Sequence, residues 1–238
     1  MFWRKKIAVV SLKGSIGGGI NPQATVRLLD GLSKNGKIRA VVLNIDSPGG
    51  GAGPSETLYM AVARLSQKKP VVAYFEGMGA SGAYEMAIPA TRIVAPRSAL
   101  IGSIGVISAK LSLKGLLERW GINLTFIKSG EHKDMLAPHR ELTKEEEMMV
   151  QKTTDELYED FISRVSESRH LPPGKVREMA TGEVFSGRVA RDYGLVDENG
   201  DLNLAIEIAS KLSGVPSHRV VYVSPGRSLL QMVMEPWF

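Results

Sequence analysis

The chain has 238 residues, of which 43% are hydrophobic and 23% are charged, and its formal net charge is +5. These proportions are typical of a globular protein with a packed core and exclude disordered and collagen-like classes. Basic residues are mixed with acidic ones, and no dense basic run carries interleaved aromatic residues, so we expect no nucleic-acid partner.

Two further absences narrow the possible chemistry. The chain has no cysteine, which excludes disulfides, a thiolate nucleophile and cysteine-based metal sites. No apolar stretch reaches the roughly 20 residues that span a bilayer, and no signal-peptide pattern precedes the first expected strand. No metal-ligand cluster or nucleotide motif is present, so we expect neither a metal nor a cofactor.

Short apolar runs, rich in β-branched residues, alternate with helical patterns in the first half of the chain. The expected strands are at residues 7–12, 40–45, 71–75, 92–95 and 124–127, and the expected helices are at 25–34 and 55–65. This alternation predicts an α/β fold in which βαβ units surround a mostly parallel sheet.

The second half is predicted to be mainly helical. Its expected parts are a long helix at 143–168, a C-terminal segment at 179–223 with a helix at 202–212 and a strand at 220–223, and an apolar tail at 224–238. Thr143 and Glu146 have the spacing of a capping box, which marks the start of the long helix. The helix and the C-terminal segment are expected to pack on the core of one domain, 1–238, and the tail on a neighbouring subunit.

Two glycine-rich turns follow successive expected strands, at residues 44–51 and 76–83. Open α/β sheets bind ligands at the carboxyl ends of their strands, and glycines there let backbone N–H groups approach a ligand. A phosphate loop is disfavoured, because no Gly-Lys-Ser or Gly-Lys-Thr follows. Gly50 and Gly82 are therefore candidates for the two N–H donors of an oxyanion hole.

Ser81 lies in the second turn, where a helix-compatible run begins. A helix N-terminus stabilises negative charge that develops during acyl transfer, which favours Ser81 as a nucleophile. The alternative is a serine that caps the helix and packs beside small residues. This segment leaves both interpretations open.

A nucleophilic serine needs a base, and the histidines of this chain lie in stretches without a triad pattern. A lysine can act as a base when burial or nearby positive charge lowers its pKa. Lys128 and Lys133 both follow the expected strand at 124–127 and are rival candidates. Either lysine would have to be buried to act in this way.

Five motifs occur in order along nearly the whole chain: DSPGGG at 46–51, GASGAY at 79–84, IGSIGV at 101–106, SGEHKD at 129–134 and LTKEE at 142–146. Together they resemble the signal peptide peptidase A family of serine peptidases, within the ClpP/crotonase fold superfamily. The resemblance implies stacked ββα units around a mostly parallel sheet. The chain departs from the family pattern at Ala83, where family members frequently have a second glycine after the serine.

The resemblance also implies roles for individual residues. These are Ser81 as nucleophile, Lys133 rather than Lys128 as general base, Gly50 and Gly82 as oxyanion donors, and Ser103 as the hydroxyl that orients the lysine. It implies hydrophobic peptide substrates such as remnant signal peptides, and a ring of identical subunits with eight as the candidate number. It further implies membrane association, whereas a complete chain without an anchor is expected in the cytoplasm.

Two other functions remain as alternatives. A crotonase-type acyl-CoA enzyme shares paired N–H donors at equivalent turns, but it would place carboxylates near the thioester, and only Glu85 is a candidate. A non-catalytic assembly module of the same fold is the second alternative. The presence of both Ser81 and Lys133 counts against this second alternative.

Overall fold

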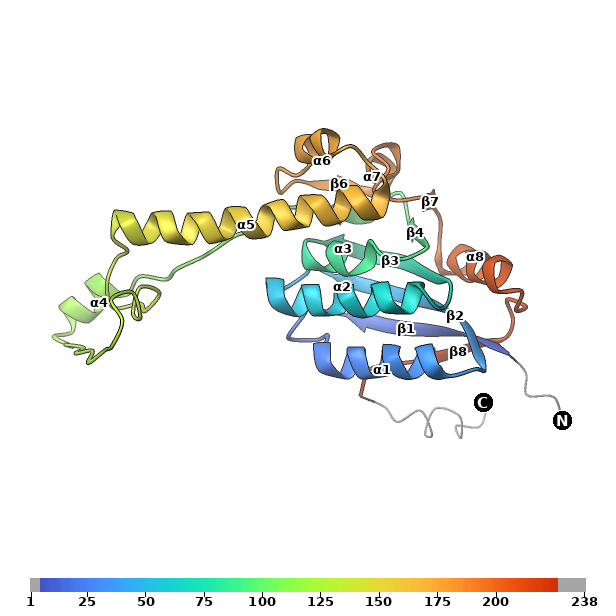
Figure 1. Cartoon of the computed structure of the whole chain (residues 1–238), viewed down its shortest axis with the longest axis horizontal. Coiled ribbons are helices and arrows are strands. Elements are labelled where there is room, and N and C mark those ends of the chain that lie inside the picture. Colours follow the sequence, from blue (N-terminus) through green and yellow to red (C-terminus); the bar gives the residue numbers. More distant parts are fainter. Residues whose placement is uncertain (1–4, 227–238) are drawn as a thin grey trace. The chain divides into compact units, whose positions relative to one another are not determined.

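The computed structural model describes residues 5–226, which form two compact units (Figure 1). The sheet unit comprises the chain up to Gly105 and from Phe161 onward, and the second unit is Val106–Asp160. Residues 227–238 of the predicted tail lie outside the described residues. The single domain over 1–238 stays a prediction.

The sheet unit is built on a mostly parallel sheet, which confirms the predicted fold class. The strand order is β6-β5-β3-β2-β1-β8, with β4 beside β3 and β7 beside β4. Only the β5–β6 pair is antiparallel among these strands. The strands are β1 (Lys6–Lys13), β2 (Ile38–Ser47), β3 (Val71–Ala80), β4 (Arg92–Ala95), β5 (Leu100–Gly102), β6 (Val184–Ser186), β7 (Glu198–Asn199) and β8 (Val220–Val223).

Helices cover both faces of this sheet. In Figure 1 the first three helices lie in a row along one face, and α8 packs against β2 and β3 from the other. The helices are α1 (Pro22–Lys34), α2 (Ala52–Ser66), α3 (Gly82–Ala87), α4 (Lys114–Arg119), α5 (Lys144–Arg169), α6 (Pro173–Met179), α7 (Gly187–Asp192) and α8 (Leu202–Ser213). The helices predicted from the sequence are confirmed, with shifted ends.

The core explains why the central strands are continuous apolar runs. On β1, Ile7 and Val9 belong to the cluster that packs on Ala205 and Ala209 of α8. Over the apolar runs of β1, β2 and β3 the alternate residues are also buried, and they point to the opposite face. A parallel sheet covered on both faces requires this pattern.

Strand β3 carries an irregularity that positions its carboxyl end. Between residues 45–47 of β2 and the matching residues 75–79 of β3, the pairing shifts so that β3 has two extra residues. The backbone N–H of Met78 donates to Oδ1 of Asp46 over 3.0 Å and thereby replaces a missing bond of the ladder. Beyond this bulge β3 continues to Ala80, five residues past the predicted end.

The long helix α5 begins with the predicted capping box. The N–H of Glu146 donates to Oγ1 of Thr143 over 3.2 Å, and the N–H of Thr143 donates to Oε2 of Glu146 over 3.0 Å. Both bonds satisfy donors at the helix start. The prediction of a helix over 143–168 is confirmed by α5, which also links the two units.

The second unit contains α4, the first part of α5 and long irregular segments. The strand predicted at 124–127 is wrong: Leu124 and Phe126 are about half exposed, Ile127 is fully exposed, and no strand pairs with them. An apolar run becomes a strand only where a neighbour completes its hydrogen bonds. Many of the exposed large apolar side chains lie in this unit, including Ile107, Leu111, Trp120, Leu136 and Met148. Within residues 5–226, no helix has both the length and the apolar character needed to cross a bilayer.

Candidate active site

Ser81 occupies a strained turn between β3 and α3. Its backbone has φ 52° and ψ −129°, a conformation that residues other than glycine rarely adopt. Helix α3 begins directly after it, but the Ser81 side chain makes no capping hydrogen bond. The geometry therefore gives no support to the capping alternative and leaves a half-buried hydroxyl at the turn.

The neighbouring strand β5 holds this turn in place. Ala80 and Gly102 lie opposite each other at the ends of β3 and β5, and the N–H of Ser81 donates to the Gly102 carbonyl over 2.8 Å. Ser103 follows Gly102 and also has a positive φ, 48°. Its N–H donates to the carbonyl of Glu183 over 2.7 Å. The structure thus brings Ser81 and Ser103 to the same end of two adjoining strands.

Gly82 directly follows Ser81 in the chain, Gly50 lies close to Gly82 in the fold, and neither position has room for a side chain. A Cβ atom at Gly82 would lie 2.0 Å from Oγ of Ser55 and 3.5 Å from the nitrogen of Gly50. A Cβ atom at Gly50 would lie 2.3 Å from the carbonyl oxygen of Ile16. Within residues 5–226, neither glycine N–H donates a hydrogen bond. Two unpaired N–H groups therefore come from adjacent turns.

Side-chain hydroxyls fix the turn that carries Gly50. The buried Ser47 accepts a hydrogen bond from the N–H of Gly49 over 3.1 Å. The hydroxyl of Ser55 donates to the carbonyl of Gly51 over 2.9 Å. Serines on both sides therefore fix the conformation of the glycine turn.

Helix α3 is anchored at two further points. The hydroxyl of Tyr84 donates to the carbonyl of Leu195 over 2.9 Å, and complete burial raises the pKa of Tyr84 well above its usual value. Glu85 forms an ion pair with Arg164, which also binds Glu56. Because Glu85 is buried and paired, its geometry fits a structural role and not the role that an acyl-CoA enzyme would need.

The two candidate lysines differ in their surroundings, and both belong to the second unit. Nζ of Lys128 donates to Oδ1 of Asp134 over 2.5 Å and to the carbonyl of Glu131 over 2.7 Å. Lys133 is exposed in the single chain, and its side chain makes no hydrogen bond or ion pair within residues 5–226. Ser81 and Lys133 therefore lie on different units.

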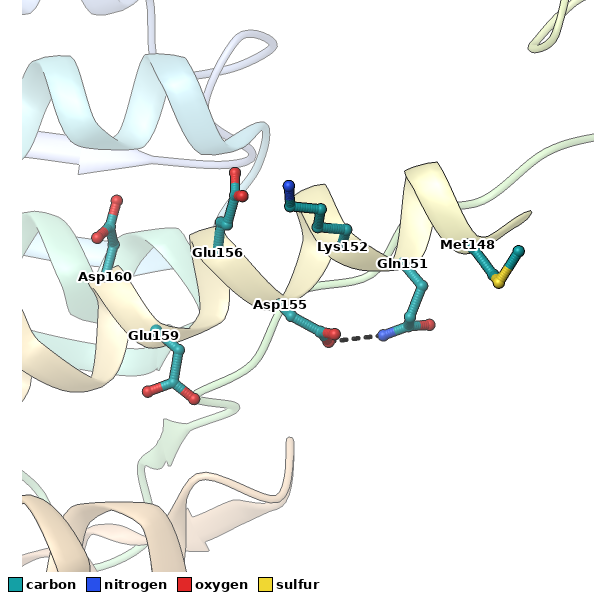
Figure 2. A pocket seen from close by; sticks show the side chains of 7 residues that line it. All are labelled: Met148, Gln151, Lys152, Asp155, Glu156, Glu159 and Asp160. Carbon is teal, nitrogen blue, oxygen red and sulfur yellow. Dashed lines mark hydrogen bonds between the residues drawn. The ribbon is translucent and has the colours of Figure 1, made fainter. Parts of the chain in front are cut away.

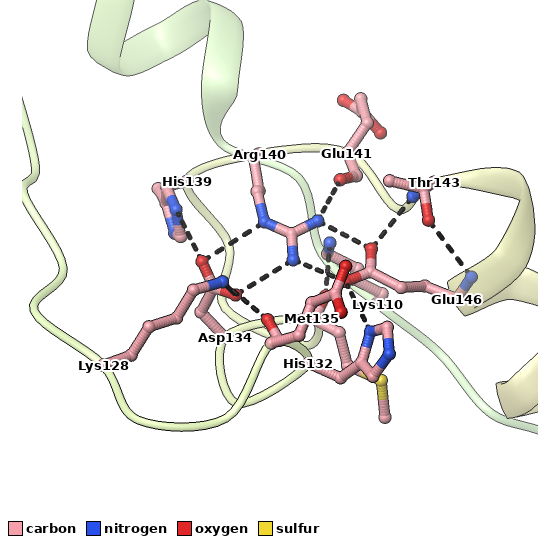
Figure 3. Close-up of polar contacts among 11 residues, drawn as sticks. Lys110, Lys128, His132, Asp134, Met135, His139, Arg140, Glu141, Thr143 and Glu146 are labelled. Atoms are coloured by element: carbon pink, nitrogen blue, oxygen red, sulfur yellow. Dashed lines mark hydrogen bonds and ion pairs between the residues drawn. The ribbon is translucent and has the colours of Figure 1, made fainter.

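An arginine that sequence reasoning missed lies at the centre of the polar contacts around Asp134 (Figure 3). Arg140 binds Asp134 and Glu146 at once, and hydrogen bonds from Arg140 lower the pKa of both carboxyls, that of Glu146 to about 2. The only signal in the sequence was an arginine midway between two acidic residues, which is too common to single out.

A shallow hollow of about 570 Å³ runs along one side of α5 in the second unit (Figure 2). It is lined by Met148, Gln151, Lys152, Asp155, Glu156, Glu159 and Asp160. Gln151 donates a hydrogen bond to Asp155 over 2.7 Å. The lining contains no predicted site residue, and its acidic character does not suit a nucleophilic site.

The sequence pattern of peptidase family S49 matches residues 63–216, a span that includes Ser81, Ser103 and Lys133. This chain belongs to peptidase family S49. Family S49 membership makes it a peptidase and confirms the resemblance to signal peptide peptidase A.

Three similar proteins support this assignment. A putative protease of Methanocaldococcus jannaschii is 40% identical over 233 residues, which cover 93% of this chain and 75% of the relative. The chloroplastic serine protease SPPA of Arabidopsis thaliana is 34% identical over 92% of this chain and 34% of its own length. A putative signal peptide peptidase SppA of Enterococcus faecium is 31% identical over 80% of this chain and 56% of its own.

Two solved structures confirm the fold. A mutant of a membrane-bound stomatin-specific protease has a TM-score of 0.60 at 15% identity, over 94% of this chain and 99% of that one. A mutant of ClpP1 from Listeria monocytogenes has a TM-score of 0.56 at 14% identity, over 83% of this chain and 93% of that one. The family S49 chain therefore has a ClpP-like fold.

Proposed function

We propose that this chain is a serine endopeptidase in which Ser81 is the nucleophile and Lys133 is the general base. The observation that carries the proposal is the turn at Ser81, which keeps a strained backbone and a hydroxyl that does not cap its helix. The unpaired N–H groups of Gly50 and Gly82 beside it suit an oxyanion hole.

The chemistry follows from these groups. Neutral Lys133 removes the proton of the Ser81 hydroxyl as Ser81 Oγ attacks the peptide carbonyl carbon, and the two glycine N–H groups stabilise the oxyanion. Lys133 passes the proton to the departing amine, which leaves an ester on Ser81. Water then attacks this ester, loses its proton to Lys133, and releases the acid while Ser81 Oγ recovers its proton.

The choice of Lys133 over Lys128 rests on their partners. Lys128 is engaged by the carboxylate of Asp134 and the carbonyl of Glu131, whereas Lys133 keeps an unpaired amine. Lys133 must lose its exposure to become a neutral base. We propose that assembly of identical subunits buries it, in a ring for which eight subunits is the candidate number. The exposed apolar side chains of the second unit supply surface for such contacts.

Ser103 is proposed to orient Lys133 through its hydroxyl, because it lies beside Ser81 at the end of the neighbouring strand. The substrates proposed are hydrophobic peptides such as remnant signal peptides. Support comes from the relative described as a putative signal peptide peptidase. The stomatin-specific relative is membrane-bound, which supports membrane association of this chain as a further proposal.

Cleavage of a fluorogenic library of hydrophobic peptides tests this function. The full chain should cleave members of the library, and Ser81→Ala and Lys133→Ala should each lower kcat by about 10⁴-fold or more. A fluorophosphonate should label the wild type at Ser81, as located by mass spectrometry of the digested protein.

Lys128→Ala is the matched control, since it removes an amine from the same loop. It should keep most of the activity. Full hydrolysis by Lys133→Ala would exclude Lys133 as the base, and a loss confined to Lys128→Ala would assign that role to Lys128. Absence of labelling in a folded, assembled wild type would contradict a nucleophilic Ser81.

A further inference from the structure

The guanidinium of Arg140 joins two carboxylates, Asp134 and Glu146, that are not neighbours in the sequence. Its Nη2 donates to Oδ1 of Asp134 over 3.0 Å and to Oε1 of Glu146 over 2.6 Å. Its Nε donates to the other oxygen of Asp134 over 3.3 Å, and its Nη1 to the other oxygen of Glu146 over 2.7 Å. Both carboxylates are thus bound through both oxygens by one planar cation (Figure 3).

The two carboxylates that Arg140 binds are buried, and they lie in different parts of the second unit. Asp134 is 8% exposed and Glu146 is 3% exposed, and hydrogen bonds from Arg140 lower the pKa of each carboxyl. Both therefore stay ionised at neutral pH. Glu146 caps α5, whereas Asp134 directly follows Lys133. Arg140 consequently joins the residue next to Lys133 to the first turn of a rigid helix.

We name residues 128–140 the lysine loop. Its backbone folds through successive turns, with the N–H of Lys133 donating to the carbonyl of Gly130 over 3.3 Å. Nζ of Lys110 donates to the carbonyl of Met135 over 2.7 Å, which ties the same loop to the preceding segment. Nδ1 of His132 also lies 3.7 Å from Oε1 of Glu146, but Arg140 binds both oxygens of Glu146 at 2.6 and 2.7 Å, so Arg140 is the main attachment of the loop to α5.

We infer that Arg140 is a positioning residue for Lys133, which it serves by clamping the lysine loop to α5 through Asp134 and Glu146. The inference rests on the proposed role of Lys133. The clamp also keeps Asp134 and Lys128 paired, so that of the two lysines in this loop Lys133 is the one with an unpaired amine. An arginine is required because its fork binds two carboxylates in fixed directions, which the single ammonium group of lysine does not.

Kinetics of the full-length, assembled protein test the clamp. Arg140→Met should lower kcat by about 100-fold through misplacement of the base, while KM stays within about twofold. Arg140→Lys should recover part of kcat. The matched control is Arg119→Met, which removes an exposed cation from the same unit and should leave kcat unchanged. A wild-type kcat for Arg140→Met would overturn the inference.

Fluorophosphonate labelling of Ser81 separates positioning from general support of the fold. If Arg140 acts through Lys133, then Lys133→Ala and the double variant Lys133→Ala/Arg140→Met should label at the same residual rate. A markedly slower double variant would overturn the inference, because Arg140 would then act on Ser81 without Lys133. If Arg140→Met does not fold, Glu146→Gln decides the question, since it weakens the clamp while Asp134 stays paired. An unchanged kcat for Glu146→Gln would also overturn the inference.

Failure of the clamp and failure of the proposed function give different results. Full activity of Lys133→Ala would remove the proposed base, and the clamp would lose its purpose. Loss of activity in Lys133→Ala together with wild-type kinetics in Arg140→Met would leave the peptidase proposal intact and exclude the clamp alone.

Discussion

The backbone N–H of Ser81 donates a 2.8 Å hydrogen bond to the carbonyl oxygen of Gly102. The N–H of Ser81 is therefore occupied in holding the turn. The N–H groups of Gly50 and Gly82 donate no hydrogen bond within residues 5–226. Ser81 and Ser103, one residue beyond the paired ends of β3 and β5, both have positive φ. Strain of this kind persists only where surrounding structure enforces it, and it gathers at functional sites.

Backbone strain at Ser81 is measurable by comparing two substitutions at this position. Ser81→Gly should be more stable than Ser81→Ala by about 1 kcal/mol, because glycine adopts φ 52° at little cost whereas alanine keeps the strain. Both variants lack the hydroxyl, so their difference reports on the backbone. Urea unfolding gives this difference, and equal stability would argue against strain.

Gly82→Ala should lower kcat by about 100-fold or more and should destabilise the fold. The added methyl group would lie 2.0 Å from Oγ and 2.7 Å from Cβ of Ser55. Adding Ser55→Gly removes both atoms and should restore part of the melting temperature. If the double variant melts no higher than Gly82→Ala, the clash with Ser55 is not the cause.

Ser103→Gly should lower kcat by about 10-fold, which corresponds to the loss of one hydrogen bond to the base. Glycine accepts the positive φ of residue 103, so stability should not fall. Thermal melting and steady-state kinetics measured on the same sample check both parts. Unchanged kcat would remove Ser103 from the proposed site.

The pairing of Glu85 with Arg164 predicts a structural phenotype. Glu85→Gln should keep peptide cleavage, since its carboxylate has no chemical role in the proposed reaction. Arg164→Met should destabilise the protein by about 3 kcal/mol, because it leaves Glu85 buried without its cation. Denaturant titrations measure the second effect, and loss of cleavage by a stable Glu85→Gln variant would revive the acyl-CoA alternative.

Acid should weaken the second unit within a defined window. Hydrogen bonds from Arg140 and from the backbone of Thr143 lower the pKa of Glu146 from 4.5 to about 2. A lowered carboxyl pKa adds stability that is complete above pH 4.5 and is lost as the pH falls from 4.5 towards about 2. Glu146→Gln should flatten this decline, whereas the exposed neighbour Glu145→Gln should not. Urea unfolding across the window measures both slopes.

Local patterns predicted much of this fold. The strands 7–12, 40–45, 71–75 and 92–95 were identifiable because each is a buried apolar run, and Thr143 marked the start of α5 through its own side chain. The missed start of α1 at Pro22 had a local signal, since the N–H of Ala24 donates to the side chain of Asn21.

Features that depend on distant partners were not predictable in this way. Strands β5 and β6 have three residues each and exist because β5 pairs with the end of β3. The run at 124–127 has strand-like residues but no partner strand. The positive φ of Ser81 is set by its neighbours in the fold, and Arg140 belongs to no periodic pattern. The sequence therefore indicated which residues to examine at the site but not the geometry that holds them.

The irregularity in β3 has a consequence for the face on which the hydroxyl of residue 81 emerges. Side chains alternate between the two sides of a strand, and β3 carries two extra residues opposite residues 45–47. Because two is an even number, side chains after the bulge keep the alternation of those before it. A deletion of one residue between 75 and 79 would turn every later side chain, up to the turn at residue 81, to the opposite face. We therefore expect a change of one residue in the length of this segment to turn the side chain of residue 81 to the other face, and a change of two residues to preserve its direction.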